Sequence, residues 1–124
     1  MSAKKLILDF YKSDALINPE LMDSYIHPDI IIDWNSSKGF VQLKRQEILN
    51  MSAELQRAYV RSKVRVEDIV ESGDTVAIRF SHYAKTIENP REEMLLGHFM
   101  AFWKVSDGKL IRSHQMSQPS YISI

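Results

Sequence analysis

The sequence predicts a single α+β domain over residues 1–124, with helices packed on one face of a curved, mostly antiparallel β-sheet. Two patterns support this class. Apolar residues recur at helical spacing through most of the first half of the chain, and they alternate with period two from residue 62 onward. A length of 124 residues suits one domain with one hydrophobic core.

Three segments of the first half are predicted to be helices. Residues 4–16 carry apolar side chains along one side of a helix, and residues 43–59 repeat the same spacing. Between them, residues 18–26 begin with Asn18, a good N-cap, followed by Pro19 at the first helical position. The apolar residues that define the two longer helices are Leu6, Ile7, Phe10 and Tyr11 in the first, and Ile48, Met51 and Leu55 in the other.

Five segments are predicted to be strands. One of them, residues 27–34, separates the second and third helices and places Ile32 and Trp34 on one face and Asp33 on the other. The other four follow the helices as an antiparallel meander, with turns at Gly73, near Pro90 and at 107–108. These four strands cover residues 62–70, 75–86, 94–105 and 109–118.

Composition excludes several classes of function. Lys plus Arg equal Asp plus Glu at 16 each, so the chain has no broad positive field for nucleic acid. It has no cysteine, which excludes disulfides, thiolate metal sites and a cysteine nucleophile. The first apolar stretch is interrupted by charges, which makes it too polar for a signal peptide, and it is too short to cross a bilayer. We therefore expect a cytoplasmic protein with no nucleic-acid or membrane partner.

The order of these elements is similar to that of a known superfamily. The stretches that carry the similarity are FYKSDALINPELMDSYIHPDIIID, VEDIVESGDTVAIRF and FMAFWKVSDGKLIRSHQMS. Together they resemble the SnoaL-like branch of the nuclear transport factor 2-like superfamily. The resemblance implies a cone-shaped fold of helices against a bent sheet. It does not fix a function, because the superfamily includes isomerases, dehydratases, cyclases, epoxide hydrolases and members without chemistry.

The catalytic carboxylates of this superfamily have no counterpart at the matching positions. The base of the ketosteroid isomerases corresponds to Trp34, and their oxyanion-hole tyrosine corresponds to Phe10, with Tyr11 one position away. The acidic residue that ends the last strand of the polyketide cyclases corresponds to Gln118, whose amide cannot accept a proton at neutral pH. The resemblance therefore implies neither the ketosteroid isomerase mechanism nor the polyketide cyclase mechanism for this chain, because each depends on a carboxylate.

Three histidines are the remaining candidates for catalysis. A turn near Pro90 would place His82 opposite His98, and a turn at Asp107 would place His98 diagonal to His114. One face of the sheet would then carry all three, and we expect burial to lower their pKa values. They could act as a general acid/base pair, as in the scytalone dehydratase branch, which relies on pocket histidines. The alternatives are that each imidazole only bonds to a neighbour in a half-buried pocket, or that the three bind zinc.

The same face predicts a pocket for a small, mostly apolar molecule, with no cofactor and no metal ion. Its expected ligand-binding residues are Phe10, Tyr11, Trp34, Met100, Met116 and Gln118. Two classes of function stay open at this point. One is a lyase, isomerase or hydrolase that uses the histidines, and the other is a non-catalytic ligand-binding or assembly module.

The opposite face of the sheet is predicted to form a homodimer. Members of the similar superfamily commonly pair sheet to sheet, and this face has too much aromatic surface to leave in water. By alternation it would carry Ala77, Arg79, Ser81, Tyr83, Phe99, Ala101 and Trp103.

Overall fold

The structure is a computed structural model that describes residues 2–120. Its elements along the chain are α1 (Ala3–Lys12), the short 3-10 helix η1 (Ala15–Ile17), α2 (Pro19–Tyr25), β1 (Ile26–Ser36), β2 (Gly39–Lys44), α3 (Arg45–Ala58), β3 (Tyr59–Ser72), β4 (Thr75–Thr86), β5 (Glu93–Ser106) and β6 (Lys109–Pro119). Within residues 2–120, no helix combines the length and apolar character needed to cross a membrane.

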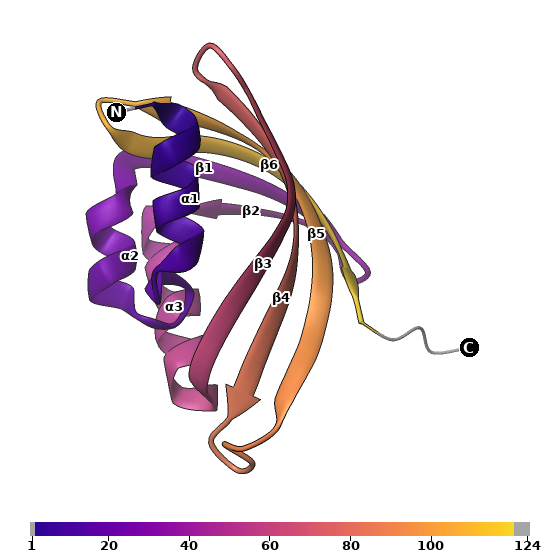
Figure 1. Cartoon of the computed structure of the whole chain (residues 1–124). Coiled ribbons are helices and arrows are strands. Elements are labelled where there is room, and N and C mark those ends of the chain that lie inside the picture. Colours follow the sequence, from indigo (N-terminus) through magenta and orange to yellow (C-terminus); the bar gives the residue numbers. More distant parts are fainter. Residues whose placement is uncertain (1, 121–124) are drawn as a thin grey trace.

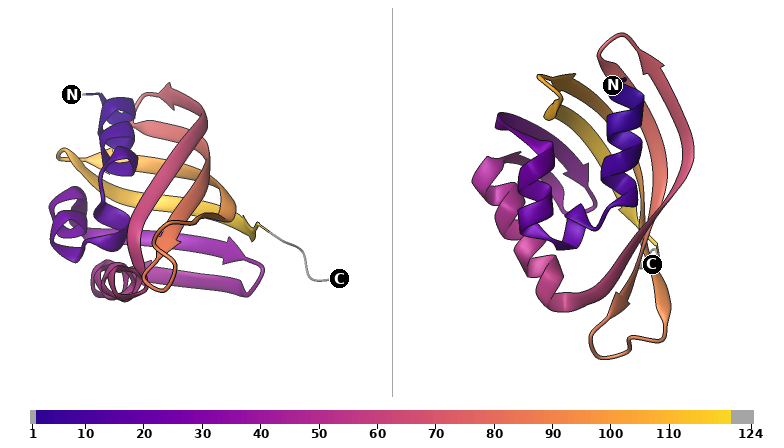
Figure 2. Two further views of the ribbon diagram at one scale, coloured as in Figure 1. Left: turned by 60° about the horizontal axis from the view of Figure 1, so that its bottom comes forward. Right: turned by 60° about the vertical axis from the view of Figure 1, so that its left-hand side comes forward.

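The strands form one six-stranded sheet in the order β2-β1-β6-β5-β4-β3. Neighbouring strands are antiparallel except for β1 and β6, which run parallel. The sheet bends around α1, and the helices lie on its concave side (Figure 1), as two rotated views also show (Figure 2). The predicted α+β class, with helices on a strongly bent and mostly antiparallel sheet, is confirmed.

The first two α-helices begin at side-chain caps. The Ser2 hydroxyl accepts a hydrogen bond from the Lys5 backbone amide at 3.1 Å. The predicted cap Asn18 accepts in the same way from the Leu21 amide at 3.2 Å. Pro19 follows at the start of α2, where its missing N–H leaves no hydrogen bond unmade.

The apolar face of α1 packs against the concave face of the sheet. The helix buries Leu6, Ile7, Phe10 and Tyr11, the four residues that helical spacing predicts. Burial of each large apolar side chain stabilises the fold by about 1.5–3 kcal/mol. The sheet side of the same core is formed by Val76, Ile78 and Phe80 of β4, Ala101 and Trp103 of β5, and Leu110 of β6.

Strand β2 is absent from the sequence-based prediction. It forms a hairpin with β1 in which Ser36 pairs with Gly39, and Gly39 has a φ of 107°, a conformation that favours glycine. Because β2 is an edge strand whose side chains are mostly exposed, it lacks the apolar alternation that reveals a half-buried strand.

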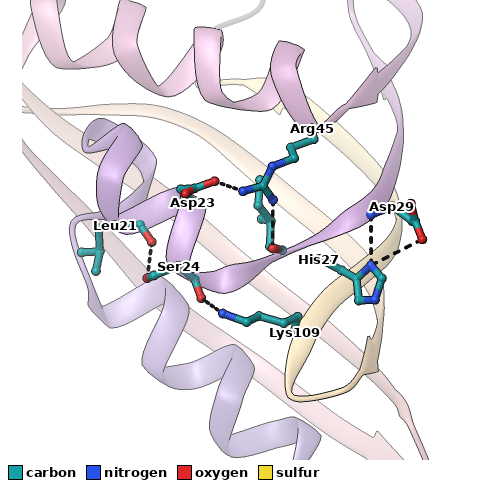
Figure 3. Close-up of polar contacts among 8 residues, drawn as sticks. Leu21, Asp23, Ser24, His27, Asp29, Arg45 and Lys109 are labelled. Atoms are coloured by element: carbon teal, nitrogen blue, oxygen red, sulfur yellow. Dashed lines mark hydrogen bonds and ion pairs between the residues drawn. The ribbon is translucent and has the colours of Figure 1, made fainter.

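Polar contacts fix the junction where α2 leads into β1 (Figure 3). The Arg45 guanidinium, at the start of α3, bonds to the Asp23 carboxylate and to the Ile26 carbonyl. Lys109, at the start of β6, donates to the Ser24 carbonyl. These contacts attach α2 to both α3 and the last hairpin.

A β-bulge in β5 decides which of its side chains face the helices. Near the turn, Tyr83 of β4 pairs with Leu95, but the preceding residue, His82, pairs with Gly97. Leu96 is therefore an extra residue in β5. Because side chains alternate with period two, one extra residue reverses the face of every later residue in the strand.

A second bulge lies in β6. Val105 pairs with Leu110, whereas Lys104 pairs with Arg112, so Ile111 is the extra residue. Beyond this bulge, the odd-numbered residues of β6 lie on the concave face and the even-numbered ones on the convex face.

Candidate ligand-binding site

A cavity of about 350 Å³ lies between the helices and the concave face of the sheet. Its wall is mostly apolar and aromatic and is formed by α1, α3 and strands from across the sheet. Its lining residues include Tyr11, Trp34, His82, Phe99, Trp103 and Ser117. Within residues 2–120, no aspartate or glutamate lines this cavity.

Of the histidines in the described part of the chain, His82 alone lines the cavity. It extends from β4 and is 7% exposed. Its Nε2 atom lies 2.7 Å from the Ser62 hydroxyl of β3, and its Nδ1 atom has no hydrogen-bond partner among residues 2–120. Burial lowers the pKa of His82 from 6.5 to about 4, so the ring is neutral at pH 7. The unused nitrogen can donate to or accept from a bound molecule, according to the tautomer.

The prediction that three histidines share one cavity is wrong. Because of the bulge at Leu96, His98 pairs with Ser81 and lies on the convex face of the sheet. His114 lies on the same convex face, opposite Phe102. The sheet separates both rings from His82, so the described residues form neither a histidine acid/base pair nor a three-histidine zinc site. No group of three potential metal ligands occurs within residues 2–120.

Two predicted ligand-binding residues also lie outside the cavity. Met100 and Met116 pair with each other on the convex face and are 62% and 66% exposed. The extra residue Leu96 in β5 is the reason for Met100, and the extra residue Ile111 in β6 is the reason for Met116. Gln118 is among the residues that line the cavity, but its side chain is exposed. In the sheet it pairs with His98, which lies on the convex face.

The other three predicted ligand-binding residues, Phe10, Tyr11 and Trp34, line the cavity. The ring of Phe10 meets Tyr11 edge-on at a centroid distance of 4.8 Å and Trp103 at 5.9 Å. Trp34 extends from β1 at the other side of the sheet, 6.4 Å from the ring of Phe99. Aromatic rings from α1, β1 and β5 therefore form much of the wall of the cavity.

Phe99, Ala101 and Trp103 were predicted to lie on the convex face, and this assignment is wrong for the same reason as for His98. Phe99 stacks on Phe80 with centroids 4.9 Å apart and an interplanar angle of 1°. Ala101 and Trp103 are buried in the core. The convex face carries Met100 and Phe102 of β5 in their place.

Hydroxyl groups add to the polar part of the wall, and those of the strands are not among the predicted site residues. Trp34 Nε1 donates to the Ser117 hydroxyl at 2.8 Å, and Trp103 Nε1 donates to the Tyr11 hydroxyl at 2.9 Å. Burial raises the pKa of Tyr11 above its ordinary value, so its hydroxyl keeps its proton. Strand register brings Ser117 into the wall and Ser62 against His82, and neither can be predicted because serine itself carries no distinctive signal.

Asp33 points away from the cavity, as the alternation of β1 predicts. Its carboxylate accepts hydrogen bonds from Arg112 at 2.6 Å and from Gln42 at 2.9 Å on the convex face, and His114 lies 3.6 Å away. The hydrogen bond from Arg112, followed by that from Gln42, holds the pKa of Asp33 below its ordinary value. This carboxylate therefore stays ionised at neutral pH and takes no part in the cavity.

A bent sheet that encloses an apolar cavity against N-terminal helices is the arrangement of the nuclear transport factor 2-like fold class. Within this class, the chain belongs to the SnoaL-like domain family, whose sequence profile matches residues 10–113. Among curated protein sequences, none matches the chain.

Solved structures with low sequence identity share the fold. IdmH from Streptomyces antibioticus, a proposed polyketide cyclase, has a TM-score of 0.73 at 20% identity over 94% of this chain and 92% of its own. TerC, crystallised with polyporic acid, has a TM-score of 0.63 at 20% identity over 91% and 88%. A protein from Catenulispora acidiphila with a ketosteroid isomerase-like fold, in complex with trimethylamine, has a TM-score of 0.67 at 12% identity over 96% and 85%.

Proposed function

We propose that the protein binds a small, uncharged and mostly apolar molecule in the cavity between the helices and the sheet. The observation that carries this proposal is the wall of the cavity, which combines aromatic rings with a few polar groups that have unused hydrogen-bonding capacity. Small-molecule sites typically have this composition and volumes of roughly 300–1,000 Å³. The cavity, at about 350 Å³, suits a molecule of a few fused rings.

The charges around the cavity favour neutral ligands and disfavour cations. His82 is neutral at pH 7, and among the described lining residues Lys38 is the sole ionised side chain. A cationic ligand would lose its hydration shell without gaining a counter-ion, which is costly in an apolar site.

Two similar proteins support a ligand-binding role. TerC was crystallised with polyporic acid, and the Catenulispora protein with trimethylamine. The shared fold therefore accommodates small molecules elsewhere, and the cavity of this chain has the size and lining for the same kind of role.

A catalytic role for His82 is the second candidate, as part of a lyase, isomerase or hydrolase. Its place in the cavity and its Nδ1 atom, which has no hydrogen-bond partner among residues 2–120, support this role. A pKa of about 4 makes the imidazole a weak base at pH 7, and no second histidine is at hand to share a proton transfer. We therefore favour ligand binding over catalysis as the function of the cavity.

A homodimer through the convex face is the assembly that we infer. Met100, Phe102 and Met116 are neighbours in the strand register, and each is at least 60% exposed. A contiguous exposed apolar patch of this kind is typical of an interaction surface. A non-catalytic assembly module would use the same patch and leave the cavity without a ligand.

The test is a thermal-shift screen of small neutral aromatic molecules, repeated on a variant with a filled cavity. Met51→Trp adds an indole to the wall at α3, and the control Val70→Trp adds the same group at an exposed position of β3. We expect true ligands to raise the Tm of the wild type and of Val70→Trp but not that of Met51→Trp. Equal stabilisation of all three proteins would contradict binding in the cavity.

A further inference from the structure

We propose that the free edge of β3, at residues 60–64, binds an extended acidic peptide segment of a partner protein, which joins the sheet as an additional strand. This inference concerns a site other than the cavity and does not depend on the proposed ligand binding.

The first observation is that β3 is an edge strand (Figure 2). It is the last strand in the sheet order, so β4 is its one strand partner among residues 2–120. The Glu71 end of β3 lies against the start of α1, where the Lys4 backbone amide donates to the Glu71 carboxylate at 2.8 Å. An open edge presents backbone N–H and C=O groups to which an extended chain can bond.

The register shows which backbone groups of β3 point toward the open edge. In β4, Thr75 follows the two-residue turn and bonds to β3, and every second residue after it does the same. His82 and Ala84 fall between these bonded positions. Their partners, Val64 and Ser62, therefore direct their backbone N–H and C=O groups away from β4. Neither backbone has another hydrogen-bond partner among residues 2–120.

A groove lies beside this part of the edge. Its volume is about 600 Å³, and residues 60–64 of β3 form one of its sides. Tyr11, Lys12 and Asp14, at the end of α1 and just after it, form the other. The free backbone groups of β3 therefore border a groove in which an extended chain can lie.

The charges of the groove favour an acidic segment. Its ionised side chains are Lys12, Arg61 and Lys63 against Asp14, which leaves an excess of positive charge. None of these three cations forms an ion pair within the described part of the chain. Carboxylates of a bound strand could pair with them, and complementary charge of this kind selects the partner.

The same charges disfavour a second copy of this chain at the edge. Arg61 and Lys63 alternate along β3 with Ser62 and Val64, so the two cations share one face of the strand. Antiparallel pairing of β3 with β3 of another copy would bring these cations beside like charges, which is destabilising. An acidic strand from a different protein avoids this repulsion.

The experiment uses short fluorescent peptides in which threonine, a residue that favours strands, alternates with glutamate or with lysine. Two further versions of the glutamate peptide carry N-methyl groups, one on the threonine amides and the other on the glutamate amides. Dissociation constants are measured by fluorescence anisotropy for the wild type, Lys63→Glu and the control Lys104→Glu. Lys104 is also an exposed lysine of a strand, but it lies on β5, away from the edge. Arg61→Glu repeats the test in case Lys63→Glu folds poorly.

We expect the wild type and Lys104→Glu to bind the glutamate peptide about tenfold more tightly than the lysine peptide. Lys63→Glu should weaken binding of the glutamate peptide by about threefold or more. One methylated peptide should lose its binding and the other should keep it, because alternate amides of an added strand face β3 and solvent.

Hydrogen exchange followed by NMR locates the bound peptide. The amides of Ser62 and Val64 should exchange fast in the free protein and slowly with the glutamate peptide, whereas the Lys63 amide, which faces β4, should be protected in both. Equal affinity for the glutamate and lysine peptides, or no difference between the two methylated peptides, would overturn the proposal. Unchanged binding by Lys63→Glu and Arg61→Glu, or failure of every peptide to bind, would overturn it as well and leave the proposed function of the cavity unaffected.

Discussion

Ser62 Oγ and His82 Nε2 lie 2.7 Å apart on neighbouring strands, and this contact orients an imidazole that is almost fully buried in the wall of the cavity. Nε2 of the ring is bonded to Ser62 of β3, and Nδ1 has no hydrogen-bond partner among residues 2–120. The contact thus sets which ring nitrogen is bonded within the protein, while burial keeps the imidazole neutral at pH 7.

The stability of the protein should fall between pH 6.5 and pH 4 because of His82. Burial lowers its pKa to about 4, so in this window the unfolded chain binds a proton that the folded protein does not. The free energy of unfolding therefore falls as the pH falls, by about 3 kcal/mol below the folded pKa. Urea denaturation at pH 7 and pH 4 measures this loss. His82→Gln should lose less stability over the same window, and an equal loss in the two proteins would contradict the assignment.

Ser62→Ala should change the electronic state of the His82 ring without changing the fold. The variant removes the partner of Nε2, which should lower the free energy of unfolding by about 1 kcal/mol and shift the ring ¹⁵N resonances of His82. Ser81→Ala is the matched control, because the Ser81 hydroxyl makes the equivalent contact with His98 on the convex face at 3.1 Å. Identical His82 resonances in the wild type and Ser62→Ala would show that the contact does not exist in solution.

Gly97→Ala should destabilise the sheet beside the bulge. A Cβ atom at this position would lie 2.8 Å from the backbone carbonyl oxygen of Gln118, which cannot move without disturbing the pairing of β5 and β6. We expect a loss of roughly 1–3 kcal/mol in the free energy of unfolding, measured by urea denaturation. A change smaller than about 0.5 kcal/mol would mean that the two strands approach less closely than described.

Phe102→Glu should convert the inferred dimer into a monomer. The side chain is 60% exposed on the convex face, beside Met100 and Met116 in the register, and a carboxylate there would be buried at a sheet-to-sheet interface. Light scattering at micromolar concentration is the measurement, with Ile87→Glu, an exposed residue outside the sheet, as the control. A wild type that is already monomeric would contradict the inferred assembly.

Much of the fold could be predicted from the sequence because its signals are local. The cap at Asn18, the helical spacing of α1 and the turn at Asp107–Gly108, where φ is 55° and 71°, each depend on a few adjacent residues. The edge strand β2 could not be predicted, since its exposed side chains carry no alternation.

The site could be predicted only in part, because it depends on register. Phe10, Tyr11 and Trp34 precede the bulges, and simple periodicity places them at the cavity. His98 and Met100 follow the extra residue Leu96, which has no sequence signal of its own, and the resulting shift of one residue reverses their face. The extra residue Ile111 of β6 hides Ser117 in the same way, and the pairing of β6 with β1 brings its hydroxyl to Trp34.

The central claim is that the cavity binds a small neutral molecule. The most direct test is a crystal structure of the protein soaked with the molecule that raises its Tm most in the screen. The account predicts electron density for that molecule in the cavity, between Trp34, Phe99 and His82. An empty cavity, with the molecule bound instead over Met100 and Phe102 on the convex face, would contradict it.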